Sequence, residues 1–476
     1  MSKFNLRMLR DLVALSGGEL LSKVAGFLAF AYLARTLEPA TYGAVEFAVA
    51  LSVLFALFID FGFGPVGARE IATNSANIKP YAARIPAARL ILTCIAIPLM
   101  GGLAIVMGQP YETIQLVWLF SFALIAVPWN QRWLFQGVEM MSWVSIGQII
   151  RMTAFALGVV IWVHGTDDLM IIGVIEIGAA AAMALYFIVV QQLKVTPVRL
   201  DFNFIELKRL KLEAFPVGLS RVMWALGLYL PTMLIALLVG GAEIAWFGAA
   251  HRIVLSIATF SMIYHFNLFP TVSRKLGESL HAFDGLIQPS FRVSSWGGIF
   301  VAFTVTLVAV PVCQFVYGES FSVAGAPLAI LIWLFPVTLL SGHARWSLIA
   351  SGHQHYLLLA QTIGLITTFL GGIILIPVYG AVGASSIMVF SSIVVWFVAH
   401  LYVSRLVNPL PFIGPTWRPL LVAAIIFGVI HEVGNSLWVD TIAAIAGFII
   451  LAPIVDSLLI RDIRKLANAK GSVKKK

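Results

Sequence analysis

Long apolar runs constrain the fold of this sequence more than any other feature. Hydrophobic residues make up 60% of the 476 residues and charged residues only 11%, against roughly 25% charged in soluble domains. Because water cannot solvate so much apolar surface, we predict an all-α integral membrane protein. About fourteen runs approach the roughly 20 residues that cross a bilayer, and they lie at 12–34, 43–66, 85–107, 113–137, 143–164, 169–192, 214–239, 243–269, 289–313, 323–350, 356–377, 381–404, 418–434 and 438–460.

The loops between these runs alternate in charge. Cationic loops occur at 69–84, 194–211 and 461–476, whereas the intervening loops are mainly acidic, as at Asp167 and Asp168. Since Lys and Arg stay on the cytoplasmic side, both termini are predicted to face the cytoplasm. The net charge of +9 does not indicate nucleic-acid binding, because the basic residues lie between apolar spans and form no single patch.

An internal repeat predicts how the chain is divided. The stretch YLARTLEPATYGAVEFAVALSVLFALFIDFGFGPVGAREIA at 32–72 returns 205 residues later as WFGAAHRIVLSIATFSMIYHFNLFPTVSRKL, so that Gly43 corresponds to Gly248 and Asp60 to His265. Such repeats are typical of secondary transporters. With the longest loop near 193–213, we predict an N-terminal lobe at 1–200, a C-terminal lobe at 201–405, and a trailing helix pair with a basic tail at 406–476.

Ionisable residues inside the spans are the candidate site residues, because charges at membrane depth are rare and usually line a cavity or pathway. Lys23, Arg221 and Arg252 lie in corresponding helices of the two halves and are predicted to converge on a central space, where the planar guanidinium suits phosphate. The full set of candidate cations for a substrate-binding cavity is Lys23, Arg151, Arg221, Arg252 and Arg345. The candidate acids for ion coupling are Glu19, Glu46, Asp60 and Glu176.

Several of these candidates have a structural alternative. Glu19 and Lys23 are four residues apart and can neutralise each other on one helical face. Arg151 can pair with Glu176 without touching substrate. The glycines around Asp60 favour a structural role for it at the end of its helix, and Arg345 can extend its charge to the membrane surface.

The sequence offers no convincing metal site. His343, His353 and His355 cluster near a helix end without supporting acids or cysteines, and Cys94 and Cys313 are isolated inside apolar runs. We therefore predict neither a metal site nor a catalytic residue, and no cofactor beyond a proton or sodium gradient.

The repeated stretch resembles a known family. LARTLEPATYGAVEFA and FIDFGFGPVGAREIA resemble the polysaccharide biosynthesis (Wzx-type) flippases of the multidrug/oligosaccharidyl-lipid/polysaccharide (MOP) superfamily, although Glu38 replaces their usual glycine. WLFQGVEMM at 133–141, YGESFSVAGAPLAIL at 317–331 and PVYGAVGASSI at 377–387 are weaker matches. The resemblance implies two six-helix lobes forming a V-shaped central cavity, plus two C-terminal helices.

It also implies a function. The chain would be a non-enzymatic flippase in the bacterial cytoplasmic membrane, moving an undecaprenyl-pyrophosphate-linked oligosaccharide from the inner to the outer leaflet by alternating access. Its partners would be that polyprenyl-linked glycan, membrane lipids and the polysaccharide polymerase and export proteins. Three alternatives stay open: a lipid II flippase, a multidrug and toxin extrusion exporter, and a membrane polymerase or ligase of lipid-linked sugars. The excess of buried cations disfavours the multidrug and toxin extrusion exporter, whose substrates are cationic. The short external loops disfavour the polymerase or ligase, since such enzymes need a sizeable external loop for their catalytic residues.

Overall fold

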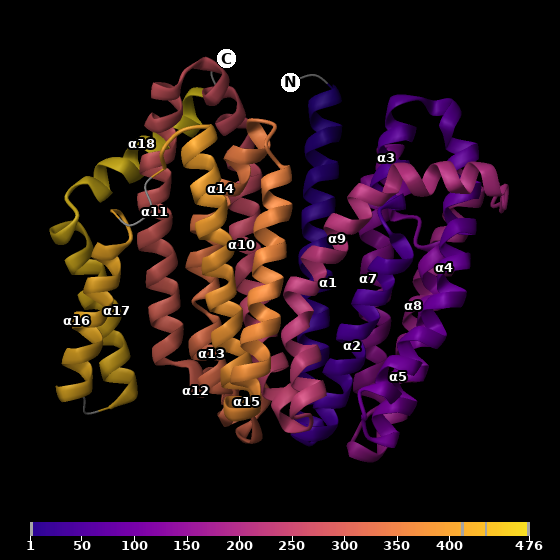
Figure 1. Ribbon diagram of the computed structural model, residues 1–476, viewed down its shortest axis with the longest axis horizontal. Coiled ribbons are helices and arrows are strands. Elements are labelled where there is room, and N and C mark those ends of the chain that lie inside the picture. The colour runs from indigo at the N-terminus through magenta and orange to yellow at the C-terminus, as the bar shows by residue number, and fades with distance from the viewer. Residues whose placement is uncertain (1–2, 411–413, 434–435, 474–476) are drawn as a thin grey trace. The chain divides into compact units, whose positions relative to one another are not determined.

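The computed structural model describes residues 3–410, 414–433 and 436–473, with side chains for this range except at 3–17, Glu19, Val433 and 467–473. These residues form helices α1 to α18 and short 3-10 turns, and no strand occurs among them (Figure 1). The all-α class is therefore confirmed. Ten of the described helices are long and apolar enough to cross a membrane, or eleven if α11 and α12, bent by 70°, form one span.

The predicted total of about fourteen spans stays a prediction. The long helix α15 (His355–Leu406) contains two of the predicted spans, because Gly380 breaks it with φ 52° and ψ −128°. The helix α16 (Trp417–Val433) has 17 residues and is short for a span. The basic residues Lys474–Lys476 of the predicted tail lie outside the described residues.

The chain forms two compact units, Met1–Gly248 and Ala249–Lys476, which divide within α10. This division rests on packing alone, and the predicted lobes at 1–200 and 201–405 stay a prediction. In the first unit α7 packs between α1 and α8, and α2 packs on α4, α5 and α9. Its helices are α1 (Lys3–Thr36), α2 (Pro39–Asp60), α3 (Phe63–Thr73), α4 (Ile78–Val106), α5 (Tyr111–Ala123), α6 (Arg132–Gly137), α7 (Met141–Trp162), α8 (Leu169–Lys194) and α9 (Phe204–Leu238), with 3-10 turns η1 (Ser75–Asn77), η2 (Leu124–Trp129) and η3 (Thr166–Asp168).

In the second unit α11 contacts α14, α16, α17 and α18, and α14 packs along α15. The helices that complete the chain are α10 (Ala242–Glu278), α11 (Leu280–Leu307), α12 (Ala309–Tyr317), α13 (Gly325–Leu331), α14 (Leu334–Ala350), α15, α16, α17 (Leu437–Val455) and α18 (Leu458–Val473), with the 3-10 turn η4 (Glu319–Ala324). The predicted span 438–460 is wrong at its end, because Asp456 separates α17 from α18. The Asp456 carboxylate is 1% exposed and accepts a hydrogen bond from Trp296 Nε1 at 3.2 Å.

The predicted helix 43–66 is also wrong at its end, because α2 stops at Asp60. Phe61 and Gly62 take left-handed conformations, with φ 36° and 81°, and α3 starts at Phe63. A Cβ on Gly62 would lie 2.6 Å from the carbonyl oxygen of Ala214 and 2.6 Å from the backbone nitrogen of Gly218, both in α9. Glycine is therefore required at 62 by its backbone conformation and by the close approach of α9.

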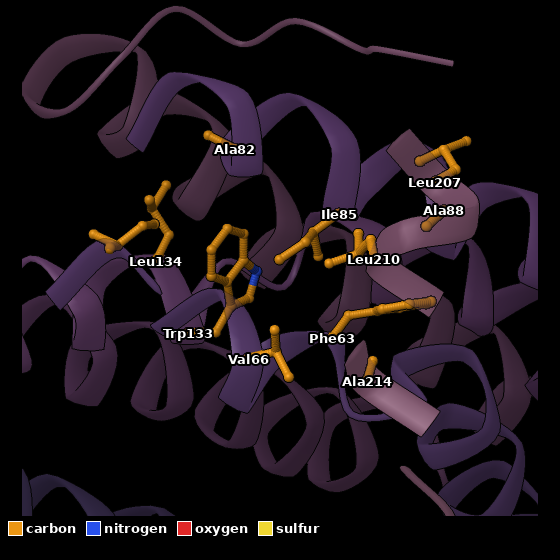
Figure 2. Packing of buried hydrophobic residues seen from close by; sticks show 11 residues of the cluster. Phe63, Val66, Ala82, Ile85, Ala88, Trp133, Leu134, Leu207, Leu210 and Ala214 are labelled. Atoms are coloured by element: carbon orange, nitrogen blue, oxygen red, sulfur yellow. The ribbon is translucent and has the colours of Figure 1, made fainter. Parts of the chain in front are cut away.

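We call the break at Phe61 and Gly62, between α2 and α3, the elbow. A buried apolar cluster packs the elbow against the neighbouring helices. Figure 2 shows side chains from α3, α4, α6 and α9 gathered around Trp133, with Phe63 near Leu210 and Ala214. The buried members of the cluster are Phe63, Val66, Ile71, Ala82, Ile85, Ala88, Trp133, Leu134, Leu207, Leu210 and Ala214. A Cβ on Gly67 would lie 2.6 Å from the Trp133 ring, so the indole packs directly on the α3 backbone.

The start of α9 differs from its prediction. The loop expected at 193–213 is shorter, because α9 begins at Phe204 and buries Leu207, Leu210 and Ala214 along one helical face. Arg84 of α4 holds this end through Asp201 at 3.0 Å and Glu206 at 2.8 Å. The backbone N–H of Asn203 and the Arg84 guanidinium also lower the pKa of Asp201 below its usual value.

The elbow generates a stability prediction. We expect Gly62→Ala to destabilise the protein by about 1–3 kcal/mol, because alanine is strained in the left-handed region and its Cβ meets the α9 backbone. The thermal unfolding midpoint of the purified protein in detergent would measure the effect. The matched control is Gly102→Ala in α4, where a Cβ meets no heavy atom within 4 Å. Equal midpoints for the two variants would contradict the prediction.

Candidate functional site

An ionic centre lies at the elbow between α2 and α3. The Asp60 carboxylate accepts hydrogen bonds from Arg89 Nη2 of α4 on one oxygen and from Arg221 Nη1 of α9 on the other. The Gly64 backbone N–H also donates to Asp60 at 3.1 Å. One acid therefore joins two arginines and the first turn of α3.

Local sequence explains why these groups meet. Asp60 is the last residue of α2, so the left-handed turn after it leaves its carboxylate beside the N–H groups that open α3. Gly218 allows α9 to touch the elbow, since a Cβ there would lie 2.6 Å from the carbonyl carbon of Phe61. Arg221 follows Gly218 by three residues on the same helical face and so reaches Asp60.

The ionic centre carries excess positive charge and is open on one side. One carboxylate faces two guanidinium groups, which leaves a net charge of about +1 because arginine stays protonated in proteins. Arg89 is only 4% exposed and also donates to the Asn130 carbonyl oxygen at 3.0 Å, whereas the Arg221 side chain is 40% exposed. An accessible guanidinium with remaining N–H donors is suited to an anionic ligand, phosphate above all.

A second ion pair joins α7 and α8. Arg151 donates through Nη2 to Glu176 Oε1, and the side chains are 28% and 11% exposed. The structure thus forms the pair that the sequence left as one of two alternatives. The substrate-binding role of Arg151 and the ion-coupling role of Glu176 stay predictions.

Glu46 lies in the first half of α2 and is buried, with 7% exposure. Its Oε1 accepts a hydrogen bond from Tyr42 Oη at 2.6 Å, and its side chain packs on Gly248, where a Cβ would come within 2.8 Å of Glu46 Cγ. Gly43, which corresponds to Gly248 in the internal repeat, packs against Gly241, Ile244 and Ala245. Both glycines of the repeat therefore mark close contacts between α2 and the start of α10.

The remaining candidates belong to other helices of the chain. Lys23 is exposed on α1, and the side chain of Glu19 lies outside the described part of the structure, so their predicted pairing is not tested. Arg252 in α10 and Arg345 in α14 are half-buried and belong to the second unit. The predicted convergence of Lys23, Arg221 and Arg252 on one space stays a prediction.

Sequence reasoning missed Arg89 and Arg292, although each is a single arginine inside a predicted span. The criterion that selected Arg221 would have found both. Arg292 of α11 lies 3.3 Å from Asp456 and donates to Asp462 at 2.6 Å, and Arg418 of α16 approaches Asp456 at 3.2 Å. Within the described ranges, no group of three or more His, Cys, Asp or Glu side chains is placed to hold a metal ion.

Comparison with known proteins shows the same architecture in transporters. The structure of "Lipid II flippase MurJ, inward closed conformation" superposes with a TM-score of 0.70 at 14% identity, covering 94% of this chain and 100% of that one. An inward-facing multidrug resistance MATE family transporter of the MOP superfamily gives 0.60 at 14% identity, covering 89% and 100%. The chain therefore shares its fold with these two membrane transporters.

The sequence places the chain more narrowly. The family described as "Polysaccharide biosynthesis protein" matches residues 8–275, more than half of the chain, and the chain belongs to that family. It is 27% identical over 234 residues to the "Putative O-antigen transporter" of Escherichia coli (strain K12), covering 48% of this chain and 55% of that protein. The protein of the same name from Shigella dysenteriae is 24% identical, covering 78% and 93%. These relatives are transporters, in agreement with the prediction that the chain is not an enzyme.

A double-mutant cycle decides what the Arg151–Glu176 pair does for the fold. We expect Arg151→Met and Glu176→Met each to lower the free energy of unfolding by about 3 kcal/mol, because each leaves an unpaired charge in the membrane. The loss is measured as a lower thermal unfolding midpoint. The double variant should return close to the wild-type midpoint, since an apolar pair leaves no charge to compensate. Additive losses in the double variant would show that the two side chains are not coupled.

Proposed function

We propose that this protein is a flippase for a polyprenyl-pyrophosphate-linked oligosaccharide. It moves the lipid-linked glycan from the inner to the outer leaflet of the bacterial cytoplasmic membrane by alternating access, for cell-surface polysaccharide synthesis. The observation that carries the proposal is the exposed guanidinium of Arg221 in an ionic centre with excess positive charge. Family membership and the O-antigen transporter names of its relatives support the same substrate class.

The pyrophosphate is the part of this substrate that the membrane resists most. It loses hydration on entering a membrane cavity, and fixed positive charge has to offset that loss. Arg221 supplies the charge without being a free buried cation, because Asp60 holds it while the site is empty. When the pyrophosphate arrives, Arg221 can share its donors between the carboxylate and the ligand, and Arg89 keeps Asp60 neutralised.

The other cations complete this proposal. Lys23, Arg252 and Arg345 are the further candidate cations for the glycan and its phosphates, and Arg151 is another candidate once its pair with Glu176 opens. Glu46 is the first candidate for a coupling proton or cation, since it is buried and hydrogen-bonded by a tyrosine. The acids Glu19, Asp60 and Glu176 are the further candidates.

A lipid II flippase is the second candidate function, because lipid II presents the same polyprenyl-pyrophosphate group to Arg221. An exporter of cationic drugs is disfavoured, since the ionic centre would repel a cation. The polysaccharide polymerase and export proteins are the proposed protein partners.

Arg221 gives the central test of the proposal. We expect Arg221→Ala to lower export of surface polysaccharide at least about tenfold, because a charge-assisted hydrogen bond contributes roughly 1.5–3 kcal/mol and about 1.4 kcal/mol is a factor of ten. Arg221→Lys should recover export in part, since lysine keeps the charge and loses the planar fork. Export is measured by complementation of a flippase-deficient strain at matched protein abundance.

The control for this experiment is Arg209→Ala. Arg209 also lies on α9, about three helical turns before Arg221, and its side chain is 76% exposed and pairs with Glu213 of the same helix. The control substitution therefore removes a guanidinium from α9 without touching the ionic centre. Export should stay at the wild-type level. Normal export by Arg221→Ala would remove the ionic centre from the substrate pathway.

Membrane topology gives a second test. If cationic loops are cytoplasmic, a reporter fused after Lys476 should be active in the cytoplasm. A reporter inserted at Asp167 and Asp168, in the turn before α8, should be active outside the membrane. Both reporters on one side would contradict the proposed orientation.

A further inference from the structure

A chain of hydrogen-bonded polar side chains crosses three helices of the second unit. Tyr264 Oη of α10 lies 2.5 Å from Ser290 Oγ of α11, and Ser290 Oγ lies 2.8 Å from His343 Nε2 of α14. His265, next to Tyr264, lies beside His343 with ring centroids 5.0 Å apart. His265, Ser290 and His343 are at most 3% exposed, whereas Tyr264 is half-buried.

One backbone carbonyl determines the tautomers of both histidines. The Leu339 oxygen is 2.9 Å from His265 Nε2 and 3.0 Å from His343 Nδ1. A carbonyl oxygen only accepts, so both of these nitrogens carry hydrogen. In the neutral rings, His343 Nε2 must then accept from the Ser290 hydroxyl, and Ser290 in turn accepts from Tyr264. His343 is therefore fully satisfied.

His265 is not satisfied. Its Nδ1 carries a lone pair, is buried, and has no hydrogen-bond partner among the described residues. The ring fits against Gly342 of α14, where any Cβ would collide with it, so the backbone there is shaped to admit an imidazole. A buried acceptor without a donor is unfavourable, and in native structures such a group marks a functional role, local strain, or a bound water or ion.

The groups around His265 determine which protonation state of its ring is favoured. The titratable and charged groups that face it are Tyr264 on its own helix and His343 and Arg345 on α14. No carboxylate is bonded to either histidine in the described ranges. A second proton on His265 would thus create a buried cation beside Arg345, with no acceptor for the new Nδ1–H. The arrangement described here favours the neutral ring, and any rearrangement that brings Nδ1 to water or an acceptor favours the protonated ring.

We propose that Nδ1 of His265 is a proton-binding site, and that binding of this proton shifts the protein between two conformations of its transport cycle. The coupling part rests on the flippase function proposed above. The repeat supports the assignment, because His265 occupies the position that Asp60 has in the first half. A ligand that binds one conformation better than another shifts their populations. Such a shift therefore requires a second conformation in which Nδ1 meets water or an acceptor.

The binding part is tested on the whole protein without substrate. The ¹⁵N-histidine spectrum of the protein in lipid nanodiscs is recorded between pH 8 and pH 5, and His265→Gln assigns the signal. Glutamine keeps a donor for Leu339 and has no titratable nitrogen. We expect a neutral His265 with hydrogen on Nε2 at pH 8, converting to imidazolium as the pH falls. A His265 with hydrogen on Nδ1, or one that stays neutral to pH 5, overturns the proposal.

The coupling part is tested in proteoliposomes, with a synthetic polyprenyl-pyrophosphate bearing one radiolabelled sugar. The wild-type rate should change by up to about tenfold per pH unit, the limit for one proton, and His265→Gln should lose this dependence. The exposed His355, changed to glutamine, is the matched control and should keep it. A His265→Gln profile equal to wild type overturns the coupling. If the probe is not moved by any protein but His265 titrates in the spectrum, the flippase function fails and the proton site stands.

Discussion

The pairing of charge inside an apolar chain is the constraint on which the first unit depends. Asp60 is almost buried, and an uncompensated carboxylate there would cost several kcal/mol. Two arginines from helices distant in sequence compensate it, and each has to arrive at a defined point. The break at Phe61 and Gly62 and the glycine contact at Gly218 bring α9 to the carboxylate, and the cluster around Trp133 holds α3, α4 and α6 in place. The ionic centre and the elbow therefore stabilise each other.

Much of the fold could be predicted because membrane helices follow simple rules of length and polarity. The all-α class follows from composition, and the helices lie where the apolar runs are. Helix ends were harder to predict, since they depend on tertiary contacts. α2 ends where α9 approaches its backbone, α17 ends where Asp456 meets Trp296 and the arginines, and α9 starts early because its charged first turns still bury Leu207 and Leu210.

The candidate site was less predictable for a related reason. A sequence shows which charges are buried in spans, but it cannot show which of them meet. Arg151 and Glu176 are 25 residues apart and pair across two neighbouring helices. Asp60 and Arg221 are 161 residues apart, and no spacing rule connects them. The sequence indicated Asp60 and Arg221 separately. Arg89, which also donates to the Asp60 carboxylate, meets the same criterion of a charged residue inside a predicted span.

The internal repeat also shows how two like halves acquire different chemistry. Gly43 and Gly248 both lie at close contacts between α2 and the start of α10, where Gly43 faces the backbone of Gly241 and Ala245 and Gly248 faces the Glu46 side chain. Asp60 and His265 differ. Asp60 is held by two arginines, so its negative charge is compensated and the ionic centre carries excess positive charge. His265 has no counter-charge and shares one carbonyl with His343, so its neutral form fits the described packing. A permanent charge is suited to holding an anionic ligand, whereas a conditional charge is suited to reporting a proton. The repeated position therefore carries a paired carboxylate where α2 ends in the first half, and a buried imidazole inside the longer helix α10 in the second half.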